Sequence, residues 1–341
     1  MSDLDLLTQS YDYQLPEHLI ASHPATPADS AKLLVYDRSS RKIVHTTFAN
    51  LLEFIPKKCQ VFLNDTKVIK ARIFGEKTTG GKVEVFLNKP LPNSLFLVLI
   101  RGKVAVGTKI TFGANTYAIV QALHDDGTRT VSFWQGEKLL DFQNLIDILE
   151  QIGHVPLPPY IQRQDTIQDE TNYQTLFAKE TGAVAAPTAS LHFTPQLLQK
   201  LKERHSTFTL TLHVGAGTFK PVDTDIITNH PMHTERFYIP HEAIEAIETK
   251  APILAIGTTV TRTIEYYART KISSGECNLF LHPHNKPLRV NHLLTNFHLP
   301  KSTLIMLVSS FIGREETLRL YDIAIKKNYR FFSYGDGMLI L

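Results

Sequence analysis

A strand that ends in two glycines could form a backbone pocket for a small ligand. The segment LTLHVGAGTFKPV (210–222) reads as such a strand and turn. A Gly-x-Gly turn is typical of nucleotide-binding sites, but the dinucleotide fingerprint requires a third glycine and a helix directly after it. No helical periodicity follows here, so the pattern argues against a Rossmann site and favours a glycine-lined pocket beside a histidine. The candidate residues are His213, Gly215, Gly217 and Thr218.

A second turn has the residue types of an anion site. The segment ILAIGTTVTRTIE (253–265) reads as a buried strand, a Gly-Thr-Thr turn and a helix. Free helix amides, two hydroxyls and a guanidinium on the first turn would bind a carboxylate or a phosphate. An ordinary strand-to-helix turn with capping threonines explains the same letters equally well. The candidate residues are Gly257, Thr258, Thr259 and Arg262.

A run of small residues, AVAAPTASLHFT (183–194), could lie against a flat ligand, because small side chains let a ligand approach the backbone closely. Thr194-Pro195 then opens a helix, and helix N-termini favour carboxylates and phosphates. A loop packed tightly against a sheet is the alternative interpretation. The candidates in this run are Thr188 for binding and His192 for acid/base chemistry.

Polar residues also stand at the ends of other apolar segments. Asn64-Asp65 follows the strand-like VFLN, where a plain turn is the alternative. The segment TNFHLPKS places polar side chains just before a strongly apolar helix, and YRFFSYGDGMLIL (329–341) combines aromatics with a turn. Aromatic side chains can stack on bases or face a cation, although they are usually core residues. The further candidates are Asn296, His298 and Asp336.

Metal sites are not expected. HPMHTER (230–236) contains His230, His233 and Glu235, but the H-E-x-x-H spacing is missing and a proline interrupts any helix. A histidine that contacts nucleic acid or acts as an acid or base fits this segment better. Cys59 and Cys277 are the only cysteines and stand alone, which excludes a disulfide framework and any zinc or iron–sulfur site built from four cysteines.

Composition is that of an ordinary soluble globular protein, and the charge is unevenly distributed along the chain. The 341 residues, 43% hydrophobic and 20% charged, suffice for two domains or for one domain with an insertion. The acidic start MSDLDLLTQS is no signal peptide and no stretch is apolar enough to span a membrane, so we expect a cytoplasmic protein. Between Lys57 and Lys109 there are 11 lysines and arginines against three acids. Such clustering is typical of phosphate-backbone binding, and a solvated sheet face is the alternative.

The expected elements divide the chain into two parts. Period-two patterns over residues 66–138 predict a compact antiparallel unit, plausibly a small barrel, and 139–152 reads as an amphipathic helix that ends it. We therefore predict an inserted β-barrel domain at 66–152 and a larger α/β domain made of 1–65 and 153–341. Alternation of strands and helices beyond Gly153 predicts a partly parallel sheet, which the segments in 1–65 could join. The expected elements there are helices near 195–204, 241–249, 260–269, 302–312 and 315–327, and strands at 208–214, 253–257 and 278–282.

The ordered motifs closely resemble the S-adenosylmethionine:tRNA ribosyltransferase-isomerase family of queuosine biosynthesis. The resemblance runs almost end to end. It departs from the usual pattern at Thr181, Ser190, Val260 and Thr261, and in the segment FLHPHNKPLRVNHL before TNFHLP. The matching segments are YDYQLPEHLIASHPATPADSAKLLVYDR, VFLNDTKVIKARIFG, GGKVEVFL, GHVPLPPYI, YQTLFAKETGAVAAPTASLHFT, LTLHVGAGTFKPV, MHTE, AIGTT, LLTNFHLPKSTLIMLVSSF and YRFFSYGDGMLI.

The resemblance implies a larger α/β domain with a smaller inserted β-barrel, and a specific reaction. The ribosyl part of S-adenosylmethionine is transferred to an aminomethyl-deazaguanine base at the wobble position of a tRNA and isomerised, which gives epoxyqueuosine, adenine and methionine. S-Adenosylmethionine is then a consumed substrate, and no cofactor or metal is needed. The expected partners are tRNAs with a GUN anticodon, of the Tyr, His, Asn and Asp types, and the enzyme is expected to act as a monomer away from membranes.

Two other functions fit parts of the pattern. A conventional RNA methyltransferase would use the same donor, but the incomplete glycine fingerprint weakens that interpretation and the isolated cysteines exclude the radical enzymes. A non-catalytic RNA-binding protein would explain the basic segment alone.

Roles follow from the motifs that match the family. We expect acid/base chemistry from one of the three histidines His192, His213 and His298. The donor would be held by Thr188, Gly215, Gly217, Thr218, Gly257, Thr258, Thr259 and Arg262. Hydroxyl contacts or orientation of the target base would come from Asn64, Asp65, Asn296 and Asp336. The anticodon stem-loop would be gripped by Lys67, Arg72, Lys82 and Arg101.

Overall fold

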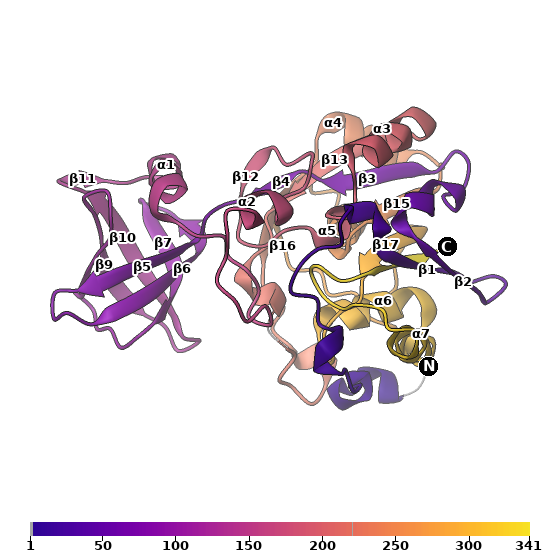
Figure 1. Ribbon diagram of the computed structural model, residues 1–341, viewed down its shortest axis with the longest axis horizontal. Helices are drawn as coiled ribbons and strands as arrows, with labels where there is room; N and C mark the ends of the chain where they lie inside the picture. Colours follow the sequence, from indigo (N-terminus) through magenta and orange to yellow (C-terminus); the bar gives the residue numbers. More distant parts are fainter. Residues whose placement is uncertain (1–2, 220) are drawn as a thin grey trace.

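A nine-stranded mixed sheet forms the centre of the larger part of the molecule (Figure 1). The computed structural model describes residues 3–219 and 221–341. The strand order is β16-β14-β13-β3-β15-β17-β18-β1-β2. The strands β13, β3, β15 and β17 are parallel to one another, whereas β14, β16, β18 and β2 enter antiparallel pairs. Their bounds are β1 (Lys32–Asp37), β2 (Lys42–Thr47), β3 (Gln60–Asn64), β13 (Thr207–Leu212), β14 (Glu235–Tyr238), β15 (Ile253–Ile256), β16 (Ser274–Cys277), β17 (His292–Asn296) and β18 (Gly337–Ile340).

Helices cover both faces of this sheet because its central strands are apolar on both sides. Alternate residues of β3 show the division: Val61 and Leu63 pack toward α3 in one core, and Phe62 packs toward α4 and α5 in another. The helices α6 and α7 pack on β1, β17 and β18 in a third core. The helix bounds are α3 (Pro195–Arg204), α4 (His241–Glu248), α5 (Thr258–Thr270), α6 (Thr303–Ile312) and α7 (Arg314–Lys326).

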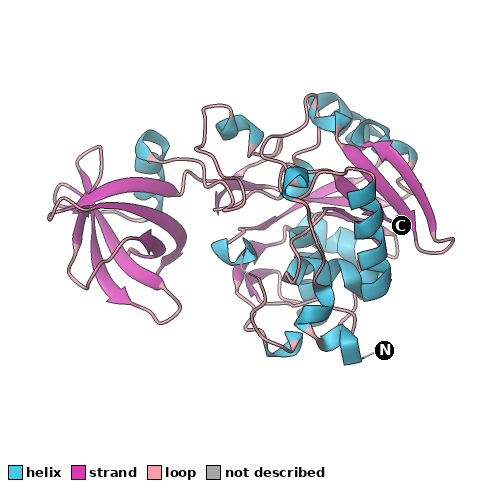
Figure 2. Cartoon of the chain, turned by 60° about the horizontal axis from the view of Figure 1, so that its bottom comes forward, coloured by secondary structure: helices cyan, strands magenta, loops and turns pink. Residues whose placement is uncertain are grey.

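A closed antiparallel barrel forms the smaller part, which stands apart from the sheet in both views (Figure 1 and Figure 2). Six strands follow the order β10-β7-β6-β5-β8-β9, and pairing of β9 with β10 closes the ring, while β11 extends it beside β10. The predicted architecture, a larger α/β part with an inserted antiparallel β-barrel, is confirmed. The bounds are β5 (Arg72–Lys77), β6 (Lys82–Leu91), β7 (Leu95–Arg101), β8 (Lys109–Thr111), β9 (Thr116–Leu123), β10 (Thr128–Gln135) and β11 (Lys138–Leu139).

Helix α1 (Phe142–Ile152) packs its apolar face into the barrel core. It begins three residues later than the sequence predicts, because Asp141 acts as its N-cap and accepts a 2.8 Å hydrogen bond from the amide of Asn144. The strand predicted at 278–282 is wrong. That segment is a loop, and two of its carbonyls accept hydrogen bonds from side chains instead of a sheet: Leu279 from Arg262, and Phe280 from Asn285.

Two chain crossings join the barrel to the sheet. The outgoing crossing follows β4 (Thr66–Val68), which pairs in parallel with β12 (Glu180–Ala183), and the returning crossing starts at Gly153. The two crossings pair with each other in a bridge between Arg72 and His154. No helix in the described part of the chain has the length and apolarity needed to cross a bilayer.

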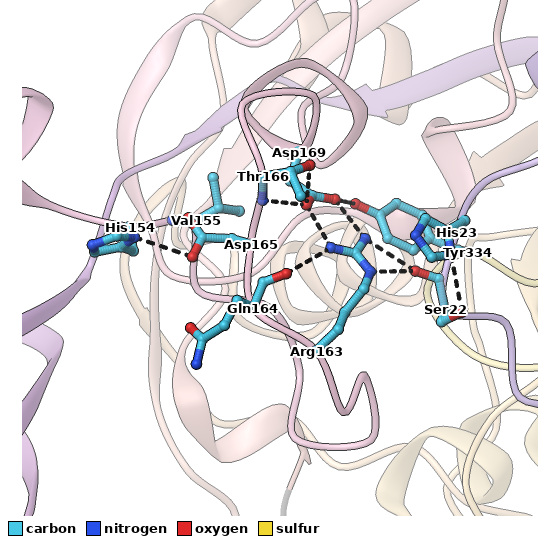
Figure 3. A network of polar contacts seen from close by, with 10 residues as sticks. All are labelled: Ser22, His23, His154, Val155, Arg163, Gln164, Asp165, Thr166, Asp169 and Tyr334. Atoms are coloured by element: carbon cyan, nitrogen blue, oxygen red, sulfur yellow. Dashed lines mark hydrogen bonds and ion pairs between the residues drawn. The ribbon is translucent and has the colours of Figure 1, made fainter.

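The returning segment is fastened to the α/β part by a polar network (Figure 3). Arg163 makes two hydrogen bonds to Asp169, of 2.7 and 2.8 Å, and also donates to the carbonyl of Ser22. The Tyr334 hydroxyl donates to the same carboxylate. Burial by itself raises the pKa of Asp169, but Arg163 and its other donors lower it to about 2. This fastening fixes the path of the proline-rich residues 156–161.

Candidate active site

A pocket opens at the carboxyl ends of β15 and β17, which is where ligands bind in open α/β sheets. Its wall of small residues is formed by 185–189, and the turn after β15 and the segment after β17 face that wall. The lining side chains that matter below are Tyr160, Thr188, Thr218, Thr258, Thr259, Thr295, Asn296, His298, Phe332 and Ser333.

The turn after β15 presents the N-terminus of α5 to this pocket. Gly257 is the N-cap of the helix and adopts φ +99°, a backbone conformation that favours glycine. No side chain caps the helix, and the first amides of a helix have no partner within it. Thr258 and Thr259 line the pocket beside these amides. The backbone and hydroxyl groups of the predicted anion site therefore face the pocket, and anion binding there stays a prediction.

Asn296 connects three walls of the pocket. Its Oδ1 accepts a 3.0 Å hydrogen bond from the Thr188 hydroxyl. Its Nδ2 donates a 3.0 Å hydrogen bond to the carbonyl of Phe332 and lies 3.4 Å from Nε2 of His192. Phe332 has φ +71°, which is rare for a residue with a side chain. Strained backbone of this kind concentrates at binding sites and persists because neighbours enforce it. The Asn296 bond is one of the contacts that hold Phe332 in this conformation.

Tyr160 lies over Phe332, with a ring-centroid distance of 4.7 Å, and its hydroxyl is 2.6 Å from that of Ser333. The two rings complete the aromatic side of the pocket. The sequence analysis missed both residues, although two prolines directly before Tyr160 indicated a stiff segment that would hold an aromatic ring in place.

His298 and His192 are buried and neutral at physiological pH. His298 lines the pocket, and its Nε2 is 2.7 Å from the Thr295 hydroxyl. His192 stacks on Phe48 at 3.9 Å and does not reach the pocket surface itself. Burial lowers the pKa of each histidine to about 3, and the charge of Arg330 adds to the effect at His192.

These lowered pKa values predict a stability change with pH. An unfolded histidine has a pKa of 6.5, so between pH 6.5 and 3 the unfolded state binds more protons than the folded state. Stability from a neutral buried histidine is therefore complete above pH 6.5 and is lost as the pH falls toward 3. The unfolding free energy of the wild type should fall as the pH is lowered from 6 to 4.5. In His298→Asn we expect the slope of this fall to be smaller by about 1.4 kcal/mol per pH unit.

Urea unfolding at several pH values measures this slope. The exposed His241 on α4 provides the matched control, and His241→Asn should leave the slope unchanged. Equal slopes in wild type and His298→Asn would contradict the prediction.

A larger cavity of about 1870 Å³, including its open mouth, lies between the barrel and the α/β part. Barrel residues on one side face the loop after β13 and the segment 230–236 on the other. Its lining includes Asn88 and Asp126 from the barrel and His213, His233, Glu235 and Arg236 from the α/β part.

The wall between pocket and cavity is the loop 213–218. Val214 lines both spaces, whereas Thr218 faces the pocket, and His213, Gly215 and Gly217 face the cavity. After the loop's first residues the chain forms a short 3₁₀ helix, η7 (Ala216–Phe219), so the absence of a Rossmann turn is confirmed. The predicted glycine turn therefore separates two spaces.

A buried carboxylate holds this loop from behind. Oε1 of Glu235 accepts hydrogen bonds from the amide of Gly215, at 2.9 Å, and from the hydroxyl of Thr218, at 3.1 Å. Its other oxygen pairs with the guanidinium of Arg262. Burial by itself raises the pKa of Glu235, but Arg262 and then His233 lower it to about 2, so the group is a carboxylate at neutral pH.

The model of a family described as "Queuosine biosynthesis protein" matches residues 8–340. The chain belongs to this family. A family member from Aliarcobacter butzleri, named S-adenosylmethionine:tRNA ribosyltransferase-isomerase, is 63% identical over 336 residues, which are 98% of this chain and 99% of the relative. A relative of the same name from Campylobacter jejuni is 58% identical over 340 residues, 99% of each chain.

A solved structure of the family agrees with the fold. The crystal structure of an S-adenosylmethionine tRNA ribosyltransferase from Thermotoga maritima is 31% identical, and the match covers 97% of this chain and 100% of that chain with a TM-score of 0.55. The predicted resemblance to the ribosyltransferase-isomerase family is confirmed.

Arg262 does not reach the ligand pocket of this family member. The sequence analysis placed it on the first turn of α5 beside the threonines, but its side chain is 3% exposed and points away. Besides Glu235 it binds the carbonyl of Leu279 at 3.0 Å. The expectation that Arg262 contacts a ligand is corrected to a supporting role, because a buried guanidinium must stay with its counter-charge.

Three other predicted ligand contacts are used inside the protein. Asn64 is fully buried and bonds Leu212, Thr66 and Thr259, so it fastens β3 to β13 and α5. Asp65 accepts a 2.7 Å bond from Thr211, and burial raises its pKa. Neither residue lines the two spaces described above.

Asp336 likewise lies in the interior. Its carboxylate accepts from the amide of Lys32 at 2.9 Å and from the amide of Arg330 at 2.8 Å, and it pairs with the Arg330 guanidinium. It therefore shapes the aromatic loop 330–336 behind the pocket.

The predicted RNA contacts lie on and near the barrel. Arg72 forms a 2.7 Å ion pair with Glu84, and Lys67 is on the connecting strand β4. Lys82 and Arg101 line one hollow on the barrel surface and make no ion pair within the described residues. Arg101 also borders a cleft between the barrel and the segment 156–164, together with Arg72.

Proposed function

We propose that this chain acts as an S-adenosylmethionine:tRNA ribosyltransferase-isomerase that binds its donor in the pocket at the carboxyl ends of β15 and β17. It transfers the ribosyl group of S-adenosylmethionine to an aminomethyl-deazaguanine base in tRNA and isomerises it. One observation supports this pocket most strongly. It combines an uncapped helix N-terminus, a wall of small residues, an aromatic side and a polar network around one space.

Each part of the donor has a chemically matched wall. The methionine carboxylate fits the amides and hydroxyls at Thr258 and Thr259, because a helix N-terminus stabilises an anion. The adenine ring fits between residues 185–187 and the ring of Phe332. The ribose hydroxyls lie within reach of Thr188 and Asn296. The neutral imidazole of His298 tolerates a sulfonium cation that an imidazolium would repel.

The target base enters through the interdomain cavity in this proposal, because the cavity shares a wall with the donor pocket and opens toward the basic barrel. The barrel then grips the anticodon stem-loop. The preferred tRNAs have a GUN anticodon, and the enzyme works as a cytoplasmic monomer without a cofactor, since the donor itself is consumed.

One assay tests the reaction against its rivals. The protein is incubated with S-adenosylmethionine and tRNA that bears the aminomethyl base, and both adenine and S-adenosylhomocysteine are measured. Adenine and methionine in equal amounts support the proposed function. Formation of S-adenosylhomocysteine instead would identify a methyltransferase. If neither product forms, the protein is a non-catalytic RNA-binding protein.

Charge reversal on the barrel should weaken tRNA binding selectively. Lys82→Glu with Arg101→Glu removes two cations from one hollow, so we expect at least a tenfold loss of tRNA affinity at about 0.1 M salt. The slope of log affinity against log salt concentration should become shallower by about 2, because binding releases fewer counterions when two phosphate contacts are lost. Filter binding at a series of salt concentrations measures both quantities, and donor affinity should not change.

The matched control is Lys326→Glu on α7, an exposed lysine of the α/β part far from the barrel (Figure 1). An unchanged salt slope in the barrel variant, or an equal change in the control, would contradict the proposed RNA surface.

A further inference from the structure

His233 lies on the cavity side of the wall that separates the two spaces. Its ring packs directly on the backbone of Gly217, where an added Cβ would be 2.7 Å from the imidazole Cγ. A larger residue at 217 would displace the ring. The side chain is 24% exposed and lines the cavity, so it is accessible to a bound base.

The orientation of the ring leaves one nitrogen for a ligand. Nε2 is buried, has no hydrogen-bond partner in the described structure and lies 3.6 Å from Oε1 of Glu235. Because Nε2 faces this carboxylate, Nδ1 is the nitrogen that remains for the cavity. An imidazole with one nitrogen directed at a carboxylate and the other at a substrate space is the arrangement of a general base.

Glu235 is suited to support a positive imidazole. It is 2% exposed and fixed by Gly215, Thr218 and Arg262, so its position does not depend on His233. The same carboxylate therefore shapes the wall and stabilises charge on the ring.

His213 is the alternative base in this cavity, and its surroundings suit that role less well. Its Nδ1 is 2.8 Å from the hydroxyl of Thr66, a neutral partner. Burial, followed by the charge of Arg236, lowers the pKa of His213 to about 4, so its imidazole is a weak base. The sequence predicted His213 as an acid/base candidate, whereas for the segment 230–236, which contains His233, it left a nucleic-acid contact and an acid/base role both open.

We propose that His233 is the base that activates the aminomethyl group of the tRNA, with Glu235 as its positioning residue; this inference rests on the proposed function. An N–H bond of the aminomethyl ammonium breaks, its electron pair stays on nitrogen as the nucleophile, and the proton moves to Nδ1 of His233. The imidazolium is stabilised by Glu235 and later releases the proton to solvent. The free amine then attacks the ribosyl group presented from the donor pocket, and the new C–N bond leaves an ammonium that loses its second proton to solvent. The C–S bond of the donor breaks with its electron pair on sulfur, which releases neutral methionine, and the bond to adenine breaks with its electron pair on the base, which takes up a proton.

The test is chemical rescue of His233→Ala in single turnover, with saturating donor and saturating aminomethyl-bearing tRNA. We expect the ribosyl-modified tRNA to form about 100-fold more slowly than with wild type, since general-base catalysis typically contributes about 10²–10⁴-fold. Added imidazole should restore the rate at least tenfold, because it can occupy the space left by the ring. Donor affinity should stay within about twofold. The exposed His241→Ala serves as control, with wild-type rate and no response to imidazole.

Two further variants separate chemistry from structure. His233→Gln keeps the packing on Gly217, so it should lose as much rate as His233→Ala but resist rescue because its side chain fills the space. Glu235→Gln keeps an acceptor for Gly215 and Thr218 and should lower the rate about tenfold at saturating donor. Glu235→Asp keeps the negative charge and should therefore recover part of this lost rate.

The outcomes distinguish the two claims. If wild type releases no adenine, the proposed function fails. If wild type is active but His233→Gln keeps its rate, or His233→Ala falls without any response to imidazole, the role of His233 is overturned. A loss confined to donor affinity would reduce both residues to a structural role.

Discussion

Arg262→Met is expected to lower the free energy of unfolding by about 3–5 kcal/mol, because it leaves the Glu235 carboxylate buried without its counter-charge. The guanidinium and the carboxylate are both almost fully buried, so solvent cannot compensate for the loss. Activity should fall as well, since Glu235 holds the loop that separates donor pocket and cavity. Urea unfolding at pH 7 measures the loss of stability.

A comparison within the chain sharpens this prediction. Arg319 pairs with Glu316 on the surface of α7, where its side chain is 46% exposed, and such pairs contribute about 0–1 kcal/mol. Arg319→Met should therefore cost far less. The double variant Arg262→Met with Glu235→Gln should lose less than the sum of the two single losses, because it removes the isolated charge. Strict additivity would show that the two groups do not interact.

Asn296→Ala is expected to reduce kcat/KM for S-adenosylmethionine about 100-fold. The change deprives the Thr188 hydroxyl and the Phe332 carbonyl of their partner, and each buried polar group left without one costs about 1–3 kcal/mol. Phe332 is then free to leave its left-handed conformation and the aromatic wall loosens. Steady-state kinetics with constant tRNA measure the loss, and about 2.7 kcal/mol of lost transition-state stabilisation corresponds to it.

An asparagine at the opposite end of the same strand provides the control. Asn291 precedes β17, as Asn296 ends it, and its side chain bonds the amide of Ile253 outside the pocket. Asn291→Ala should change stability without a comparable effect on kcat/KM. Equal kinetic losses in both variants would mean that Asn296 acts only through the sheet.

The sequence predicts the backbone of the site better than its side-chain pairings. Gly257, Thr258 and Thr259 could be placed because a strand, a turn and a helix start follow one another locally. Thr188 and Asn296, more than 100 residues apart, were both predicted, yet their hydrogen bond was not, since nothing local indicates which distant partner a side chain meets. The strand at 278–282 failed for the same reason, because side chains from other segments bind its carbonyls.

The alternating pattern of β14 contains a signal for the buried pair of Glu235 and Arg262. In β14 the burial alternates, so that Glu235 and Phe237 face the interior. An acid at an inward position of a strand is almost never buried unless it is paired. That pattern predicts a buried cation nearby, although it cannot name Arg262. The positions of Asn64 and Asp65 depend in the same way on β13, which lies far along the chain.

The place of β3 in the middle of the sheet also sets an order for biosynthesis. Its neighbours β13 and β15 begin at Thr207 and Ile253, so the ribosome must add more than 140 residues after β3 before either can pair. At about 5–20 residues per second this takes on the order of ten seconds, in which β3 and its apolar side chains wait unpaired. The barrel, whose strands all pair within residues 72–139, can close meanwhile. A nascent chain of which residues 1–152 have left the ribosome should therefore carry a folded barrel behind an N-terminal segment that is open to chaperones.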